Sequence, residues 1–535
     1  MPSRIVPFDD IVVGGGTAGA VMAARLSEER ENRVLLLEAG PDYPDEVPPE
    51  LLDASFAVLS GHNWDMQATV WEGNSASTDQ RARISRVFEG ALPNGHATAF
   101  PYPLGKVTGG SSAINGGLAL HARPEDYASW AAAGCDEWSW ERIRPFANRI
   151  ATADSNKPAL PVETPSLEEL TPCQKAFLDG CHAMGNRPVD LCQGTTAGVG
   201  PLPKSVRKGQ RVSTSALYLA AARSRTNLTV RSNCLVDKLV LERSNGSLTA
   251  TGVEALLDGT RCQFSGLHIT LSAGAINSPA ILLRSGIGTT AEIAKKNLTP
   301  LLDLPGVGKN LQDHPSVCIW AIPGKGSCVA GEPVHQIMAQ RKSKASEKLC
   351  DIQLYMLSAV PTRGIPALHR MAGSDLALGV SALLATPRSR GHVEVVDADA
   401  TKNPGIYLNC LQDSDDLRAM MEAVRSAWSI SRGESIDRHI DRLLLWTQNI
   451  IDSDRLLENL IRTMVRGTWH PVGTLRMGKA ADGMAVVDQR GRLYGCRNIT
   501  VADASIMPTI PSVPPSLTCM VIGERIAAHR CGREV

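Results

Sequence analysis

The spacing of apolar residues in the first forty positions predicts a β-α-β unit. Residues 11–13 and 33–38 are short apolar runs of the kind that forms buried strands. Between them, residues 18–29 (AGAVMAARLSEE) place apolar side chains at the spacing of one helix face. A glycine-rich turn at 14–19 joins the first strand to this helix. The chain is therefore expected to open with two buried strands connected through a helix.

Later in the chain, segments with the pattern of buried strands and helices alternate with segments of a different pattern. A strand-rich block at 228–273 and the segment after 485 continue the pattern of buried strands and helices. Residues 151–225 instead carry proline-rich joints and amphipathic helices, and residues 316–465 mix short strands with helices. This order predicts one α/β fold that is interrupted twice by a second fold.

Two segments stand out by their turn residues. Residues 72–105 are rich in glycine, proline, serine, asparagine and aspartate, and they predict a long excursion loop that could form a lid or an intersubunit contact. Residues 506–520 (IMPTIPSVPPSLTCM) contain four prolines, and apolar residues at helical spacing follow at once. Because proline fixes the backbone φ angle, this segment is expected to be held rigidly before the last helix.

The composition is that of an ordinary globular protein and excludes several classes of partner. The 535 residues are 43% hydrophobic, and 55 basic side chains balance 55 acidic ones. Proteins that bind nucleic acid or an acidic membrane surface usually carry an excess of basic residues, and a net charge near zero gives no sign of either partner. No apolar run is long enough to span a membrane, and the N-terminus lacks the pattern of a signal peptide. The 13 scattered cysteines are expected to be mostly reduced core residues, so we predict a cytoplasmic protein.

The first chemical motif is the turn at the start of the chain. Gly14, Gly16 and Gly19 have the G-x-G-x-x-G spacing between a strand and a helix. There the first glycine allows a tight turn, the second lets the backbone approach a pyrophosphate, and the third lets helix and strand pack closely. Glu38 ends the second strand, where a carboxylate can bind ribose hydroxyls. The motif predicts a dinucleotide site, with a purely structural turn as the alternative, and does not distinguish FAD from NAD.

Other chemistries are disfavoured by what the sequence lacks. It has no H-x-x-x-H motif and no Cys/His cluster, so no metal site is expected. It has no G-x-S-x-G elbow, which argues against a serine hydrolase. The acidic start of residues 413–422 (DSDDLRAMME) is expected to cap a helix rather than to act as an acid-base pair.

Five stretches spread over the whole chain resemble the signature segments of the glucose–methanol–choline (GMC) oxidoreductase family, in the family's order. They are 105–117 (GKVTGGSSAINGG), 274–288 (GAINSPAILLRSGIG), 304–315 (LPGVGKNLQDHP), 468–478 (TWHPVGTLRMG) and 498–508 (NITVADASIMP). The chain looks most similar to the shorter bacterial aryl, pyridine and furan alcohol oxidases of that family. The resemblance implies FAD rather than a nicotinamide. It implies non-covalent binding, because Ile114 stands where some members carry a flavin-tethering histidine.

The resemblance also implies the architecture. An α/β, Rossmann-like FAD-binding domain would be interrupted by an α+β substrate domain with an antiparallel sheet. The FAD-binding domain would comprise residues 1–150, 226–315 and 466–535. The substrate-binding domain would comprise residues 151–225 and 316–465.

The family motifs imply which residues contact the cofactor. The segment 105–117 would pass beside the flavin, Val236 would meet the adenine through its backbone, and Asp503 and Ala504 would approach the ribityl chain and diphosphate. The full expected set is Gly14, Gly16, Thr17, Ala18, Gly19, Glu38, Ala39, Val107, Gly110, Asn115, Gly116, Gly117, Leu118, Val236, Trp469, Asp503 and Ala504.

The implied reaction is the oxidation of a small primary alcohol, aromatic or otherwise activated, to the aldehyde. His470 matches the family's catalytic histidine and would remove the hydroxyl proton while a hydride leaves for flavin N5. Electrons would pass to oxygen or another acceptor. The expected partners are therefore the alcohol and this acceptor, for a monomer or a small homo-oligomer.

The sequence departs from the family pattern beside this histidine. Pro514 falls where many relatives place the polar partner of the catalytic histidine, and Ser516 falls where many have another polar residue beside the flavin. Proline has neither a backbone N–H nor a polar side chain, so the acid–base work would rest on His470, helped by Ser516 or a water. The start of the last helix, at 516–518, would direct free N–H groups toward the flavin pyrimidine ring.

This departure leaves two alternatives open. One is a lyase or cyclase of the same fold that keeps FAD as a structural part. The other is a flavoprotein that only binds or senses.

Overall fold

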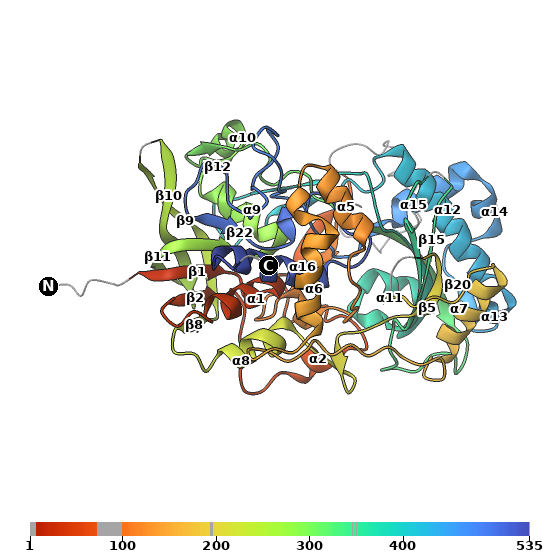
Figure 1. Ribbon diagram of the computed structural model, residues 1–535. Coiled ribbons are helices and arrows are strands. Elements are labelled where there is room, and N and C mark those ends of the chain that lie inside the picture. Colours follow the sequence, from red (N-terminus) through yellow and green to blue (C-terminus); the bar gives the residue numbers. More distant parts are fainter. Residues whose placement is uncertain are drawn as a thin grey trace.

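Two sheets with their helices lie side by side in the computed structural model, which describes residues 7–71, 99–192, 196–244, 246–344, 346–348 and 350–533. Helices α5 (Pro124–Ala132), α6 (Trp140–Ala151) and α16 (Ser516–Arg530) lie between the two sheets in the view of Figure 1. Most of the predicted excursion at 72–105, residues 72–98, lies outside the described residues, so its lid or intersubunit role stays a prediction.

The first sheet is built around the predicted β-α-β unit. β1 (Phe8–Val13) pairs in parallel with β2 (Val34–Leu37), and α1 (Thr17–Leu26) connects the two strands. All four residues of β2 are buried, as expected for a parallel strand covered on both faces. The remaining strands are β8 (Leu228–Arg231), β9 (Cys234–Ser244), β10 (Ser247–Leu257), β11 (Thr260–Leu271) and β22 (Ile499–Val501).

The long strand β11 joins a parallel and an antiparallel part of this sheet. The strand order is β8-β2-β1-β11-β10-β9, and β22 also pairs with β11. The first half of β11 pairs antiparallel with β10, and residues 266–271 pair in parallel with β1. The carboxyl ends of β1, β2 and β22 therefore meet at one edge, where ligands bind in open α/β sheets.

The second sheet is antiparallel, which confirms the predicted fold class. Its strand order is β20-β14-β17-β16-β15-β5, and β21 pairs with β14. Helices α12 (Ser414–Ser431) and α7 (Pro172–Ala183) pack on it. The strands are β5 (Gly198–Pro201), β14 (Pro315–Pro323), β15 (Ile337–Arg341), β16 (Ile352–Pro361), β17 (Leu376–Leu384), β20 (Ile440–Leu443) and β21 (Arg466–Gly467).

A smaller sheet brings an early segment of the chain beside a late one. β3 (Met66–Thr69) pairs with β4 (Ala99–Tyr102) and with β19 (Gly405–Tyr407). β19 in turn pairs with β18 (His392–Glu394). This sheet therefore contains strands from the first expected FAD-binding segment and from the second expected substrate-binding segment.

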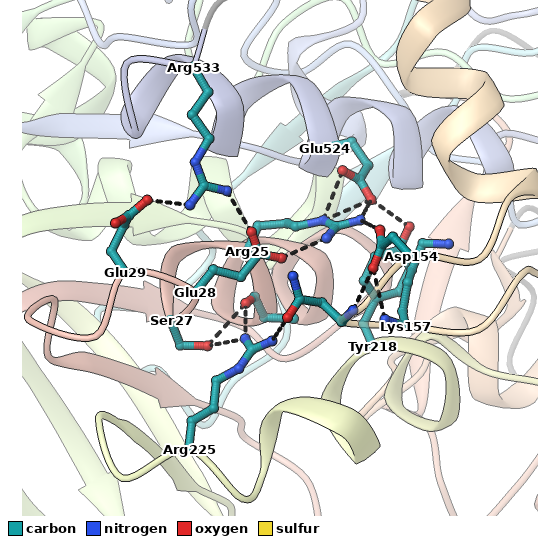
Figure 2. A network of polar contacts seen from close by, with 12 residues as sticks. Arg25, Ser27, Glu28, Glu29, Asp154, Lys157, Tyr218, Arg225, Glu524 and Arg533 are labelled. Atoms are coloured by element: carbon teal, nitrogen blue, oxygen red, sulfur yellow. Dashed lines mark hydrogen bonds and ion pairs between the residues drawn. The ribbon is translucent and has the colours of Figure 1, made fainter.

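A buried polar network fixes α1 against α16. Arg25 of α1 donates from Nε and Nη2 to the carboxylate of Glu524 on α16, at 3.0 and 2.9 Å. The Tyr218 hydroxyl donates to Glu524 Oε1 at 2.8 Å, and Arg25 also pairs with Glu28 and Asp154, at 2.6 and 2.8 Å (Figure 2). The Glu524 side chain is fully buried, so its charge depends on these donors. The network fixes the helix whose first turn reaches the cavity described below.

Two global features bear on the sequence predictions. The 13 cysteines are free thiols, and most of them are buried, as predicted. In the described part of the chain, no helix has the length and apolar character that crossing a membrane requires.

Candidate functional site

A large cavity of about 1050 Å³ extends from the glycine turn after β1 to the second sheet. Its volume is slightly above the roughly 300–1,000 Å³ typical of ligand pockets, so it has room for a dinucleotide. The predicted cofactor residues that line it are Gly14, Gly16, Thr17, Ala18, Glu38, Ala39, Gly110, Asn115, Gly116, Leu118, Val236, Trp469, Asp503 and Ala504. The predicted catalytic residues His470, Pro514 and Ser516 line the same cavity.

Two glycine segments meet at the floor of this cavity. The Gly109 N–H donates to the Gly15 carbonyl at 2.8 Å. Gly110 has a φ of +53°, and a Cβ there would lie 2.6 Å from the Gly16 Cα. The approach of the two backbones therefore requires glycine.

Helix α1 begins beside this contact, at Thr17. Its N-cap residue is Gly16, and no side chain caps the first turn. The N–H groups of this turn are left for a ligand, and the N-terminus of a helix favours phosphate. The residues present therefore fit the diphosphate of FAD.

Glu38 holds the turn from the end of β2. Its carboxylate accepts hydrogen bonds from the backbone N–H groups of Gly15 and Gly40, each at 2.8 Å. Burial raises its pKa to about 7, although these hydrogen bonds act in the opposite direction. Glu38 lines the cavity, and the ribose-binding role that the sequence predicts for it stays a prediction.

Three predicted cofactor residues lie behind the cavity wall rather than on it. A Cβ at Gly19 would lie 1.9 Å from the Gly14 carbonyl oxygen, so Gly19 permits close packing of helix and strand. Val107 is buried in a small cluster with Leu51 and Ile114. Gly117 has a φ of +73°, and a Cβ there would lie 3.8 Å from Val206. These residues shape the backbone of the site.

His470 has a histidine partner that the sequence did not indicate. Its Nδ1 lies 3.0 Å from the Nδ1 of His314, which directly precedes β14. The other ring nitrogen of His314, Nε2, lies 3.0 Å from the Pro511 carbonyl oxygen. His314 is buried, and Pro511 belongs to the proline-rich segment before α16.

These contacts assign the tautomers of both rings. A carbonyl oxygen can only accept, so His314 donates from Nε2 and, when neutral, has a lone pair at Nδ1. His470 must then donate its Nδ1 proton to His314. The Thr468 hydroxyl fits this assignment, because it donates to the His314 carbonyl at 3.1 Å and can accept the same Nδ1 proton at 3.0 Å. The Nε2 of His470, on the opposite side of its ring, is left as an unprotonated base.

The electrostatics keep both rings neutral. Burial, followed by the proximity of His314, lowers the pKa of His470 well below its usual value. Burial also lowers the pKa of His314 to about 4. Both rings are therefore in the neutral form at pH 7, and His470 can accept a proton.

Asp313 fixes the backbone that carries His470. Its Oδ1 accepts the N–H groups of His470 at 3.0 Å and of Thr468 at 3.3 Å, and its Oδ2 accepts the Tyr102 hydroxyl at 2.5 Å. Trp469, which lies between Thr468 and His470, has a φ of +64°, a value that is rare for a residue with a bulky side chain. Asp313 thus holds the strained backbone on both sides of Trp469.

The proline-rich segment forms part of the cavity wall. Pro514 and Ser516 line the cavity, and α16 begins at Ser516 without a side-chain cap. The sequence prediction left His470 without a protein partner other than Ser516. The structure supplies His314 instead, and the backbone of Pro511 orients it.

The described residues contain no group of three or more potential ligands that could hold a metal ion. The acidic start of α12 caps that helix, as predicted, because the Asp413 side chain accepts the N–H of Asp415 at 2.8 Å.

Comparison with known proteins identifies relatives along most of the chain. Two GMC oxidoreductase models match the chain, the N-terminal one over residues 8–316 and the C-terminal one over residues 387–523. The 5-(hydroxymethyl)furfural oxidase of Methylovorus sp. (strain MP688) is 30% identical over 97% of this chain and 98% of its own. An oxygen-dependent choline dehydrogenase of Escherichia coli is also 30% identical, over 98% of this chain and 96% of its own. The crystal structure of pyridoxine 4-oxidase from Mesorbium loti has a TM-score of 0.84 and 26% identity, over 98% of this chain and 99% of its own.

Proposed function

Because this chain belongs to the GMC oxidoreductase family, whose members are FAD-dependent enzymes acting on CH–OH donors, we propose that it oxidises a small primary alcohol to the aldehyde. The alcohol would be aromatic or otherwise activated, in keeping with relatives named for furfural and pyridoxine oxidation. FAD, held non-covalently, supplies the redox chemistry when bound, by taking up the carbinol hydride and passing electrons to oxygen or another acceptor.

One observation carries the proposal: His470 lines the cavity while its Nδ1 lies against His314 and Thr468, an arrangement that supports Nε2 as the free base. The substrate hydroxyl would donate to this nitrogen and transfer its proton there. His314 and Thr468 hold the opposite side of the ring, so the base cannot change tautomer without breaking a buried hydrogen bond. General-base catalysis of this kind contributes roughly 10²–10⁴-fold to the rate.

The N-terminus of α16 has a separate role. Ser516 and Cys519 of its first turn line the cavity, and its N–H groups are uncapped. The positive end of the helix would stabilise negative charge that develops nearby during the reaction.

Anaerobic mixing of the FAD-loaded protein with a panel of benzylic and furanic alcohols tests this function. We expect loss of the visible flavin absorbance and formation of one aldehyde per flavin. A protein that never bleaches with any primary alcohol would refute the proposal.

A non-redox lyase or cyclase is the second candidate, because Pro514 offers no polar side chain at the cavity. It predicts substrate conversion while the flavin stays oxidised. The His314–His470 pair favours the redox reaction, since it supplies the polar partner that Pro514 lacks.

The proposed function also suggests the partners, the compartment and the oligomeric state of the protein. The partners would be the alcohol and an electron acceptor, and the protein would act in the cytoplasm as a monomer or a small homo-oligomer. Its many free thiols support a reducing compartment.

A further inference from the structure

The second sheet contributes one wall of the cavity through alternate residues of three strands. These are Ser316, Cys318 and Trp320 of β14, Tyr355 and Leu357 of β16, and Ser381 and Leu383 of β17. The intervening residues of β14 belong to the core on the other face of the sheet. The wall is mostly apolar and aromatic, as a ring-shaped substrate requires, but it becomes polar at one end.

Arg466, Ser316 and Ser381 form this polar end, which we call the Arg466 corner. Arg466 of β21 is the cross-strand partner of Ser316, and such partners lie on the same face of a sheet. The hydroxyl oxygens of Ser316 and Ser381 lie 2.7 Å apart. All three residues line the cavity.

The charge of Arg466 is not balanced by an acid among the described residues. Its Nη1 donates to the carbonyls of Thr463 and Val465, at 2.9 and 2.7 Å, and its guanidinium lies over the Phe100 ring. Burial lowers its pKa, as expected for a desolvated cation. Asp313, on the adjoining segment, is already occupied by Tyr102 and by backbone N–H groups.

A purely structural role would account for only part of this side chain. The two carbonyls end helix α15 (Asp454–Met464), so Nη1 caps that helix. In the described part of the chain, Nε and Nη2 of Arg466 have no hydrogen-bond partner. This edge of the guanidinium has the fork geometry that binds a carboxylate through two parallel hydrogen bonds.

We propose that the Arg466 corner binds a carboxylate at the far end of the substrate, so that the preferred alcohols are ring carboxylic acids bearing a hydroxymethyl group. This inference rests on the proposed function. Arg466 and His470 both line the cavity and are four residues apart in the chain. A ring with a hydroxymethyl group on one side and a carboxylate on the other could therefore contact the base and the cation together.

Binding of 4-methylbenzoate to the FAD-loaded protein tests the corner without any turnover, because this ligand has no CH–OH group. Isothermal titration calorimetry compares it with the neutral isostere 4-methylbenzamide. We expect the carboxylate to bind at least about 10-fold more tightly, as charge-assisted hydrogen bonds imply. Arg466→Met should abolish this preference, and Arg462→Met should retain it, since Arg462 pairs with Glu458.

Arg466→Met also removes the cap of α15 and could disturb folding. Ser381→Ala leaves Arg466 intact and should weaken 4-methylbenzoate binding several-fold without changing 4-methylbenzamide binding. Equal affinity of the wild-type protein for both ligands, or an unchanged preference in Ser381→Ala and Arg466→Met, would overturn the inference.

The outcome is separable from that of the proposed function. A carboxylate preference in binding, without flavin bleaching by any alcohol, would support the corner and refute the alcohol oxidation. Bleaching by benzyl alcohol, with no binding preference and no advantage for 4-(hydroxymethyl)benzoate, would do the reverse.

Discussion

His314 and His470 are joined through their Nδ1 atoms at 3.0 Å, although 156 positions separate them in the chain. The neutral His314 ring carries a single N–H, and it donates this N–H to the Pro511 carbonyl oxygen. The hydrogen bond between the two Nδ1 atoms therefore runs from His470 to His314. The proline-rich segment thus acts on the base through a backbone carbonyl rather than through a side chain. This relationship yields the first three predictions.

Replacing His314 should slow proton abstraction without removing the base. In His314→Leu, the Nδ1 of His470 loses one of its two acceptors and keeps only the Thr468 hydroxyl. A hydroxyl can also donate, so both tautomers of His470 become accessible. We expect the anaerobic rate constant for flavin reduction to fall by about 10–100-fold, within the range of general-base effects. His439→Leu is the matched control, because His439 bonds to Ser327 away from the cavity and should reduce at the wild-type rate. Equal rates in the two variants would exclude a positioning role for His314.

The pH dependence of kcat/KM should reveal a base whose pKa lies in the acidic range. His470 must be neutral to accept a proton, and burial lowers its pKa well below 6.5. The profile should therefore be flat through neutral pH and fall only at a pH well below 6.5. An ascending limb centred at or above pH 7 would show that another group is the base.

Acid should destabilise the fold through the same pair. The unfolded chain binds a proton at His314 near pH 6.5, whereas the folded state resists protonation down to about pH 4. The contribution of this histidine is complete above pH 6.5 and is lost as the pH falls from 6.5 toward 4. Urea unfolding at pH 7, 6 and 5 should show a smaller decrease for His314→Leu than for the wild type; parallel curves would argue against the assignment.

The glycine contact at the cavity floor should be essential for FAD. Gly110→Ala places a Cβ 2.6 Å from the Gly16 Cα, so the two segments must separate. Gly185→Ala is the control, since Gly185 also has a positive φ, of +82°, but a Cβ there meets nothing within 4 Å. We expect Gly110→Ala to be purified largely without flavin and Gly185→Ala to retain it. Full FAD occupancy in Gly110→Ala would contradict the packing argument.

The buried network of Figure 2 should contribute strongly to stability. Arg25→Met leaves the buried carboxylate of Glu524 without its main donor, which costs about 3–5 kcal/mol. Arg533, at the edge of the same network, pairs with Glu28 and Glu29 through a side chain that is 40% exposed, so Arg533→Met should cost less than Arg25→Met. Denaturant unfolding of both variants measures the difference. Similar losses of unfolding free energy in the two variants would mean that the Arg25–Glu524 contact does not contribute strongly to stability.

Local patterns predicted the parts of the site that are local in sequence. The turn at Gly14, the buried strand before Glu38 and the uncapped start of α16 each depend on neighbouring residues, and each lies at the cavity. The packing role of Gly19 also follows from its spacing.

Contacts between distant segments could not be predicted in this way. The partnership of His314 and His470 depends on where β14 and β21 lie in three dimensions, and the Arg466 corner depends on their register. A one-residue shift of that register would turn Arg466 to the other face of the sheet. The sequence motif around His314 was visible, but no pattern linked it to a residue 156 positions away.

The most direct test of His470 as the base is anaerobic stopped-flow reduction of the flavin by benzyl alcohol in the wild type and in His470→Gln. Glutamine keeps the size and polarity of the side chain but cannot take up the proton. The account predicts rapid bleaching in the wild type and a rate constant lower by at least about 100-fold in the variant, with FAD still bound. Bleaching at the same rate in both proteins would contradict it.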